Sequence, residues 1–163
     1  MPEAQPGSET LDFSLTAIGS GREIRPGVLG APALFLCFGQ ETQAGRDAVE
    51  AVARGRYATP AELVVIYLID LHKIPGLLRK VAEGVLGNEH KKAVESVPPG
   101  GDPAEYVIVL PDWKGSAVQA LGLEDATRTL GLALVDEGGR VTWRYQAAEP
   151  AAALEAWLAE HPL

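Results

Sequence analysis

One thiol is the most reactive group that this 163-residue chain offers. Cys37 is the only cysteine, and a deprotonated thiol can attack a disulfide or a peroxide. Cys37 lies within the apolar run 33–38 (ALFLCF), however, and free cysteine is among the most frequently buried residue types. Burial in apolar surroundings raises the pKa of a thiol and blocks attack. We therefore predict an inert core thiol, with a redox-active Cys37 as the alternative.

A polar turn directly after this run is the second candidate. It contains Gln40, Glu41, Thr42 and Gln43, and Arg46 follows in what should be the first turn of a helix beginning near Thr42. The exposed amides at a helix N-terminus bind anions, and Arg46 would add positive charge. Helix capping by Thr42, with Glu41 favouring the same helix end, is the simpler interpretation. Both interpretations remain open at this point.

The histidines do not predict a metal site. His72, His90 and His161 lie in different predicted elements, and no convergent set of ligands with suitable spacing is visible. Asp70 precedes His72 at the end of a predicted strand, where helix initiation by the aspartate explains the pair. Trp113 follows another strand as an exposed-turn candidate. We expect no metal and no cofactor, because the chain also has no glycine-rich nucleotide-binding motif.

Composition excludes some partners. The formal net charge of −8 argues against nucleic acid, because phosphate binding needs a clustered basic face. A single cysteine excludes an internal disulfide and any cysteine-based zinc site. No apolar run approaches the roughly 20 residues that span a bilayer, so we expect no membrane partner. We predict a flexible segment over 1–10, a single domain over 11–163, and a cytoplasmic location.

The hydrophobic pattern predicts a mixed α/β sheet. Buried strands are expected at 33–38, 63–69, 106–110 and 130–135, because each is a short apolar run. An N-terminal hairpin precedes them, and the turn at 136–139 should join two antiparallel strands. On the last strand, Val141, Trp143 and Tyr145 are expected to share one face. Helical patterns lie between the strands and after Glu149, and the loop at 98–103 interrupts them.

This order of elements resembles the thioredoxin-like fold, in the form found in the redoxin and thiol-specific antioxidant (AhpC/TSA-like) group. The strings that carry the resemblance are DFSLTAIGSGREI, ALFLCFGQETQAGR and LGLALVDEGGRVTWRY. The resemblance implies a three-layer α/β/α sandwich with a mixed central sheet, an N-terminal hairpin and a helix–strand insertion.

The resemblance also implies where a site would lie. The group's Cys-x-x-Cys pair would fall on Gln43 and Arg46, or on Thr42 and Gly45 in the adjacent register. Its cis-proline position would fall on Leu130, beside Thr129. Neither hallmark is present, so the domain looks redox-degenerate. The ligand-binding residues implied by this comparison, together with the polar turn, are Gln40, Glu41, Thr42, Gln43, Arg46, Thr129 and Leu130.

The amphipathic pattern over 74–86 completes the prediction. Leu77, Leu78, Val81, Val85 and Leu86 should form a stripe that is buried on the sheet or in a dimer contact, with Gly87 ending the helix. Three functions remain open. The first is a binding module for a protein or small ligand, the second a thiol-dependent oxidoreductase or peroxidase that uses Cys37, and the third a structural homodimer subunit.

Overall fold

The computed structural model describes residues 10–163, so nearly all of the segment predicted to be flexible lies outside the described residues. A five-stranded sheet forms the centre, with the strand order β5-β4-β3-β6-β7. The strands β3, β4 and β5 are parallel, whereas β6 pairs antiparallel with both β3 and β7. Their bounds are β3 Ala33–Phe38, β4 Val64–Asp70, β5 Ile108–Asp112, β6 Gly131–Val135 and β7 Val141–Tyr145.

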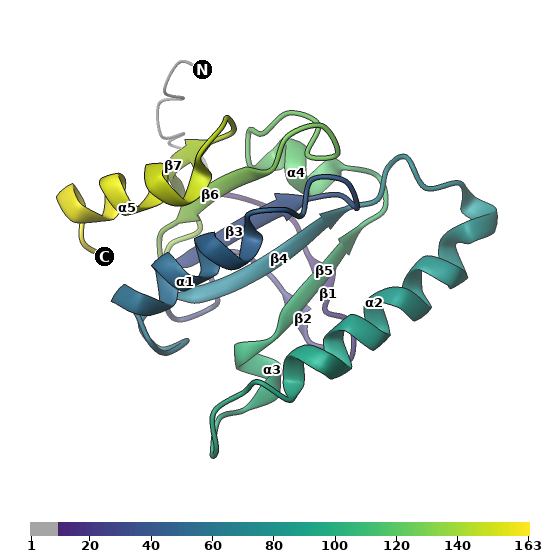
Figure 1. Cartoon of the computed structure of the whole chain (residues 1–163), viewed down its shortest axis with the longest axis horizontal. Helices are drawn as coiled ribbons and strands as arrows, with labels where there is room; N and C mark the ends of the chain where they lie inside the picture. Colours follow the sequence, from purple (N-terminus) through teal and green to yellow (C-terminus); the bar gives the residue numbers. More distant parts are fainter. Residues whose placement is uncertain (1–9) are drawn as a thin grey trace.

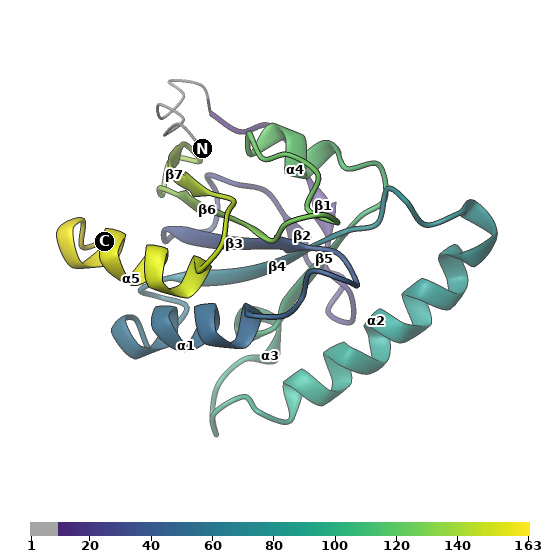
Figure 2. The same cartoon turned by 45° about the horizontal axis from the view of Figure 1, so that its top comes forward.

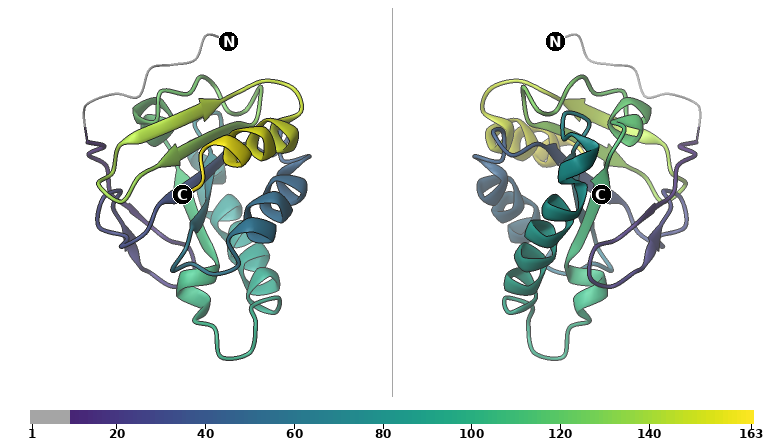
Figure 3. Two further views of the ribbon diagram at one scale, coloured as in Figure 1. Left: turned by 90° about the vertical axis from the view of Figure 1, so that its left-hand side faces the viewer. Right: turned by 90° about the vertical axis from the view of Figure 1, so that its right-hand side faces the viewer.

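Two layers cover this sheet, which gives the predicted α/β/α sandwich. One face carries the short hairpin of β1 (Leu15–Thr16) and β2 (Glu23–Ile24) together with α4 (Ser116–Ala120). The helices α1 (Arg46–Arg56), α2 (Arg79–Val94) and α5 (Pro150–Glu160) lie on the other face (Figures 1 and 3). Among residues 10–163, no helix combines the length and apolar character needed to cross a membrane.

The predicted strands agree with the structure to within one or two residues. The three central strands match best because their apolar runs are bounded by turn-forming residues. The strand predicted at 106–110 begins later, at Ile108, because Asp102 caps a short helix α3 (Pro103–Tyr106). The Asp102 side chain accepts a hydrogen bond of 2.9 Å from the Ala104 amide, and Pro103 occupies the first helical position.

The prediction that Val141, Trp143 and Tyr145 share one face of the last strand is wrong for Val141, whereas Trp143 and Tyr145 both pack under the helices. Leu134 pairs with Trp143 while Val135 pairs with Val141, so Thr142 is an extra residue on β7. Such a bulge places its neighbours on opposite faces of the sheet. Val141 accordingly packs in the core under the hairpin, and Trp143 packs under the helices.

The helix predicted over 74–86 differs in extent and in burial. A single 3₁₀ turn at Gly76–Leu78 leads into α2, which continues through Gly87 to Val94. A glycine inside a helix costs only about 1 kcal/mol relative to alanine, which is too little to end this one. Leu77, Leu78, Val81 and Val85 are exposed. The predicted burial on the sheet is therefore wrong for these four residues, whereas Leu86 is partly buried against the core under the helices. Burial of the stripe in a dimer contact stays a prediction.

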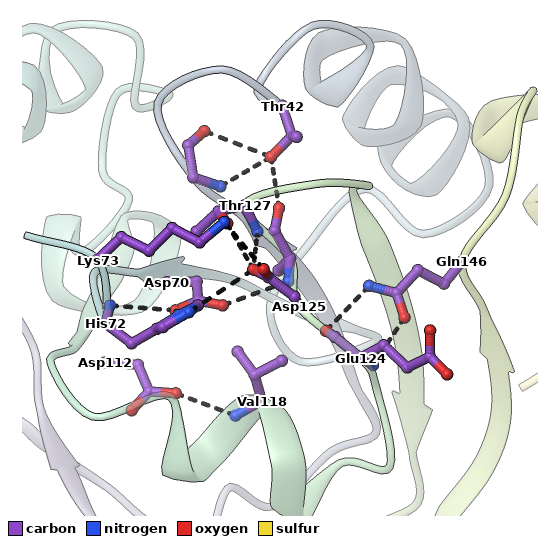
Figure 4. A network of polar contacts seen from close by, with 12 residues as sticks. Thr42, Asp70, His72, Lys73, Asp112, Val118, Glu124, Asp125, Thr127 and Gln146 are labelled. Carbon is purple, nitrogen blue, oxygen red and sulfur yellow. Dashed lines mark hydrogen bonds and ion pairs between the residues drawn. The ribbon is translucent and has the colours of Figure 1, made fainter.

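Parallel pairing brings the candidate residues together. The carboxyl ends of β3, β4 and β5 meet at one edge of the sheet, where Asp70 and Asp112 stand opposite each other. The turn after β3 and the segment 123–130 before β6 reach the same edge (Figure 4). In sheets of this kind, ligands bind outside the carboxyl ends of the strands.

Candidate functional site

The turn after β3 is held in place by Thr42. The Thr42 hydroxyl accepts a hydrogen bond of 2.8 Å from the Gly39 amide and donates one of 2.6 Å to the carbonyl oxygen of Ala126. The predicted start of the helix near Thr42 is wrong, because α1 begins at Arg46 after Gly45 in a left-handed conformation. Thr42 therefore joins the turn to the segment before β6 and does not cap the helix.

A network of charged side chains lies beside this turn (Figure 4). Asp70 is almost fully buried, and its Oδ1 atom lies 2.6 Å from Nδ1 of His72. Because an ionised carboxylate only accepts hydrogen bonds, the imidazole donates from Nδ1. The second carboxylate oxygen of Asp70 accepts a hydrogen bond of 3.3 Å from the Ala126 amide. Asp70 thus joins the end of β4 to the segment before β6.

Asp125 continues the network toward solvent. Its Oδ1 atom accepts hydrogen bonds from the amide (2.9 Å) and hydroxyl (2.5 Å) of Thr127 and lies 3.9 Å from Nε2 of His72. Its Oδ2 atom lies 3.0 Å from Nζ of Lys73. The Thr127 hydroxyl, aided by Lys73, lowers the pKa of the Asp125 carboxyl to about 2. Asp125 therefore carries its negative charge across the physiological pH range.

Asp70, His72 and Asp125 correct the expectation that no metal ligands converge. One ligand atom from each of the three lies within 4.8 Å of the others. The ammonium group of Lys73 already stands beside Asp125, however, and the Asp70 carboxylate already binds His72. Both carboxylates already have partners within the chain, so the arrangement is best explained as a polar network that ties loops together.

Cys37 lies beneath this edge with no exposed surface. Burial, together with the negative charges of Asp112 and Asp70, raises the pKa of the thiol well above its ordinary value. Asp112 is itself buried and accepts a hydrogen bond of 3.0 Å from the Val118 amide of α4. No cationic group is among the main influences on the thiol, so its surroundings disfavour the thiolate that redox chemistry requires.

A large cavity opens next to the network, between α1, α2 and the β4–β5 part of the sheet. Its volume is about 1130 Å³. Ile69 of β4, Val109 of β5 and the adjoining Val107 line one side, and Val81 and Val85 of α2 line another. Small-molecule sites are typically concave, mostly apolar and lined with a few polar groups that fix orientation. This cavity has that character, and it is slightly larger than the usual range of about 300–1,000 Å³.

The polar end of the cavity lies at the turn after β3. Gln40, Gln43 and Arg46 line it there. The Arg46 guanidinium carbon lies 5.6 Å from the ring centre of Phe38 and 5.8 Å from that of Tyr67. These cation–π contacts hold the guanidinium beside aromatic surface and reduce its freedom to move.

The structure divides the predicted binding residues into two groups. Those that line the cavity are Gln40, Glu41, Gln43 and Arg46. Those that do not are Thr42, Thr129 and Leu130. Thr42 serves the turn as described, Leu130 is buried in the core under the helices, and the Thr129 carbonyl accepts a hydrogen bond of 3.0 Å from the Gln146 side chain. Among residues 10–163 there is no cis peptide bond, so the bond before Leu130 is trans.

Sequence reasoning missed three residues of the site. Lys73 and Asp125 form an ion pair across a long separation in sequence, which no local pattern reports. Thr127 lines the cavity and also contacts Gly39 closely, since a Cβ on that glycine would lie 3.1 Å from it. The Asp-x-Thr spacing of Asp125 and Thr127 is the one available signal, because aspartate commonly bonds the backbone two residues later in turns.

The remaining candidates have local packing roles. Trp113 lies 4.4 Å from the guanidinium of Arg79 at the start of α2. The ring of His161 stacks on Trp157 with 3.6 Å between centres. His90 on α2 packs closely over Gly19 in the loop of the hairpin, where an added Cβ would overlap the imidazole.

Comparison with known proteins identifies solved structures with the same architecture. No protein-family model matches the chain, and no curated protein sequence matches it significantly. Solved structures do match. The exposed lipoprotein thioredoxin Etrx1 of Streptococcus pneumoniae superposes with a TM-score of 0.59 at 17% identity over 91% of this chain and 98% of its own. A putative thiol:disulfide interchange protein DsbE of Chlorobium tepidum gives 0.59 at 14% identity over 96% and 98%.

The fold is thioredoxin-like. A thioredoxin-like protein of Aeropyrum pernix gives a TM-score of 0.57 at 17% identity, covering 91% of this chain and 88% of its own. At such identities the likeness concerns the arrangement of the backbone. Within this thioredoxin-like domain the turn 40–46 contains no cysteine, and Cys37 lies before it inside β3.

Proposed function

We propose that this thioredoxin-like domain is a binding module that takes an apolar small molecule into the cavity between α2 and the sheet. The observation that carries the proposal is the position of the cavity. Its apolar body adjoins the carboxyl ends of the parallel strands. Its polar end lies at the turn after β3 and at Arg46, whose guanidinium makes cation–π contacts with Phe38 and Tyr67.

The state of the thiol supports a binding role over a redox role. Thiol exchange needs a thiolate that can reach its substrate, but Cys37 is fully buried and burial raises its pKa. The chain has no second cysteine that could resolve an oxidised Cys37. The oxidoreductase alternative therefore requires β3 to become exposed before each turnover.

The exposed apolar surface of α2 also supports a binding role. Among residues 10–163, six large hydrophobic residues are exposed, and four of them lie on the turn and helix beside the cavity. They are Leu77, Leu78, Val81 and Val85. Clustered apolar exposure is uncommon on a monomeric surface and typically marks an interaction site.

Titration with the uncharged fluorophore N-phenyl-1-naphthylamine tests the proposal. We expect saturable binding by the wild-type protein. Ala82→Phe should weaken binding at least tenfold, because Ala82 lines the cavity and a phenyl ring would occupy part of it. Ala159→Phe, on an exposed position of α5, is the matched control and should leave the affinity unchanged.

Two results would contradict the binding module. The first is a wild-type protein that does not bind the fluorophore, or binds it equally well after Ala82→Phe. The second is insulin disulfide reduction or peroxide consumption that Cys37→Ser abolishes, which would favour the oxidoreductase alternative. Circular dichroism of each variant checks that the fold is retained.

A further inference from the structure

The α1 wall of the cavity carries a row of charged side chains. Arg46, Glu50 and Arg54 are four residues apart, so they lie along one face of α1, and all three line the cavity. The Nη1 atom of Arg54 donates hydrogen bonds to the carbonyl oxygens of Tyr57 (3.2 Å) and Leu63 (2.8 Å), whereas its buried Nη2 atom has no hydrogen-bond partner among the described residues. Arg46 makes no such bond among the described residues, and its nearest acid is Asp47, 3.7 Å from Nε.

The acidic groups around Arg46 have other hydrogen-bond partners or are exposed to solvent. The Glu50 carboxylate accepts a hydrogen bond from the Tyr67 hydroxyl, and burial together with this bond raises the pKa of that tyrosine. Asp70 binds His72 as described. The Asp47 side chain is 93% exposed, so its interaction with Arg46 is screened by solvent. The Nη donors of Arg46 form no hydrogen bond or ion pair within residues 10–163, which leaves a planar cationic fork at the polar end of the cavity.

The opposite wall, formed by α2, contributes Glu89 and Lys92 as its charged residues, and these form an ion pair of 3.7 Å with each other. Leu78, Val81 and Val85 present their side chains along α2, and all three line the cavity while at least half exposed. The floor between the walls is the aliphatic surface of Ile69 and Val109. A molecule that binds the guanidinium of one wall and contacts the apolar side chains of the other needs an anionic group at one end and a hydrocarbon body.

We propose that the cavity binds a single-chain aliphatic carboxylate, with its head group on Arg46 and its hydrocarbon chain against α2. This inference rests on the proposed binding function and specifies its ligand class. A guanidinium presents two parallel N–H donors that match the two oxygens of a carboxylate, and such bonds are stronger than those between neutral groups. Burial of each methylene should tighten binding about fourfold, because burial of apolar surface is favourable.

The test uses three ten-carbon competitors with different head groups. Decanoate, decanol and decylamine are titrated against protein loaded with N-phenyl-1-naphthylamine, each below its micelle concentration. We expect decanoate to displace the fluorophore at a concentration at least tenfold lower than decanol requires, and decylamine to be the weakest. Octanoate should be about sixteenfold weaker than decanoate, since it buries two fewer methylenes.

Variants of Arg46 assign the selectivity to the guanidinium. In Arg46→Gln, the displacing concentration of decanol divided by that of decanoate should fall from tenfold to within twofold, because the cation is lost. Arg46→Lys keeps the charge without the fork, so its ratio should be intermediate. Arg140→Gln removes an exposed arginine from the β6–β7 turn and should keep the wild-type ratio.

The outcomes separate this inference from the proposed function. If the wild type binds the fluorophore but decanol competes as well as decanoate, the ligand class is overturned and the binding module stands. The inference is also overturned if Arg140→Gln lowers the ratio as much as Arg46→Gln. If the wild type does not bind the fluorophore and sediments as a dimer, a second copy of the chain covers α2, and both proposals fail.

Discussion

Two helices on the same face of the sheet pack in different ways. On α1, Val49 and Ala53 have no exposed surface, and this helix also contacts α5. On α2, no residue is fully buried. The helix is held near its ends, by Arg79 on Trp113 and by the partly buried Ala93 and Val94, and it runs along the β5 side of the sheet (Figure 2). One helix therefore completes the core, whereas the other forms the wall of a cavity.

The difference shows that an amphipathic pattern does not determine what packs against the apolar face of the helix. Both segments have apolar residues at helical spacing, which predicts a buried face for each. The apolar face of α1 meets the sheet, while Val81 and Val85 of α2 face the cavity. The region around α1 should thus behave as a sealed core, and the region around α2 as a surface available for binding.

The largest effect should be the protection of Cys37 in the sealed region. The thiol is fully buried and its pKa is raised, so a thiol reagent reaches it only when the protein opens. For a domain with ordinary stability, we expect labelling of the native protein to be at least a thousandfold slower than that of protein in denaturant. Mass spectrometry over time measures both rates. Comparable rates would mean that β3 is accessible in the native state.

Charge introduced under α1 should be the next most damaging change. Val49→Asp places a carboxylate in a fully buried site without a partner, and we expect it to lower the free energy of unfolding by about 3–5 kcal/mol. Ala51→Asp adds the same charge on the exposed side of α1 and should cost less than about 1 kcal/mol, mostly through helix propensity. Urea denaturation gives both values. Equal losses would contradict the sealed packing of α1.

The fold was predictable from sequence because its signals are local. The runs at 33–38 and 130–135 are apolar throughout, and the turn at Asp136 is fixed by its carboxylate, which accepts hydrogen bonds from the amides of Gly138 (3.0 Å) and Arg140 (2.9 Å). The polar end of the cavity was also predictable, since Gln43 and Arg46 follow the first buried strand. The rest depends on contacts between distant segments, such as the contact of Lys73 with Asp125 and the position of α2 relative to the sheet.

The charged network around Asp125, beside the cavity, should affect the stability of the fold at acidic pH. The pKa of Asp125 is lowered to about 2 in the folded chain, below the ordinary value of about 3.9 in an unfolded one. Its contribution to stability is therefore fully present above pH 4 and is lost as the pH falls from about 4 to 2. Carbon-13 NMR of the carboxyl group measures the pKa. Thr127→Val should raise it, because the hydroxyl is the largest cause of the shift; an unchanged value would contradict this origin.

The smallest effect on stability is expected on α2. Val81 is 64% exposed and lines the cavity, so Val81→Asp buries no charge and should change the free energy of unfolding by no more than about 1 kcal/mol. The same change places a carboxylate on the apolar wall, so binding of N-phenyl-1-naphthylamine should weaken at least tenfold. Glu83→Asp, an exposed position of α2 that does not line the cavity, is the control for both measurements.

This pair of measurements distinguishes a binding wall from a dimer contact. If α2 is free in solution, Val81→Asp lowers affinity without changing the sedimentation coefficient, because nothing but ligand covers the helix. If a second copy covers α2, wild-type protein sediments as a dimer and the variant as a monomer, and the melting temperature falls with it because dissociation removes a stabilising partner. A large loss of stability in a variant that stays monomeric would show that Val81 packs within the core, as the sequence pattern alone predicts.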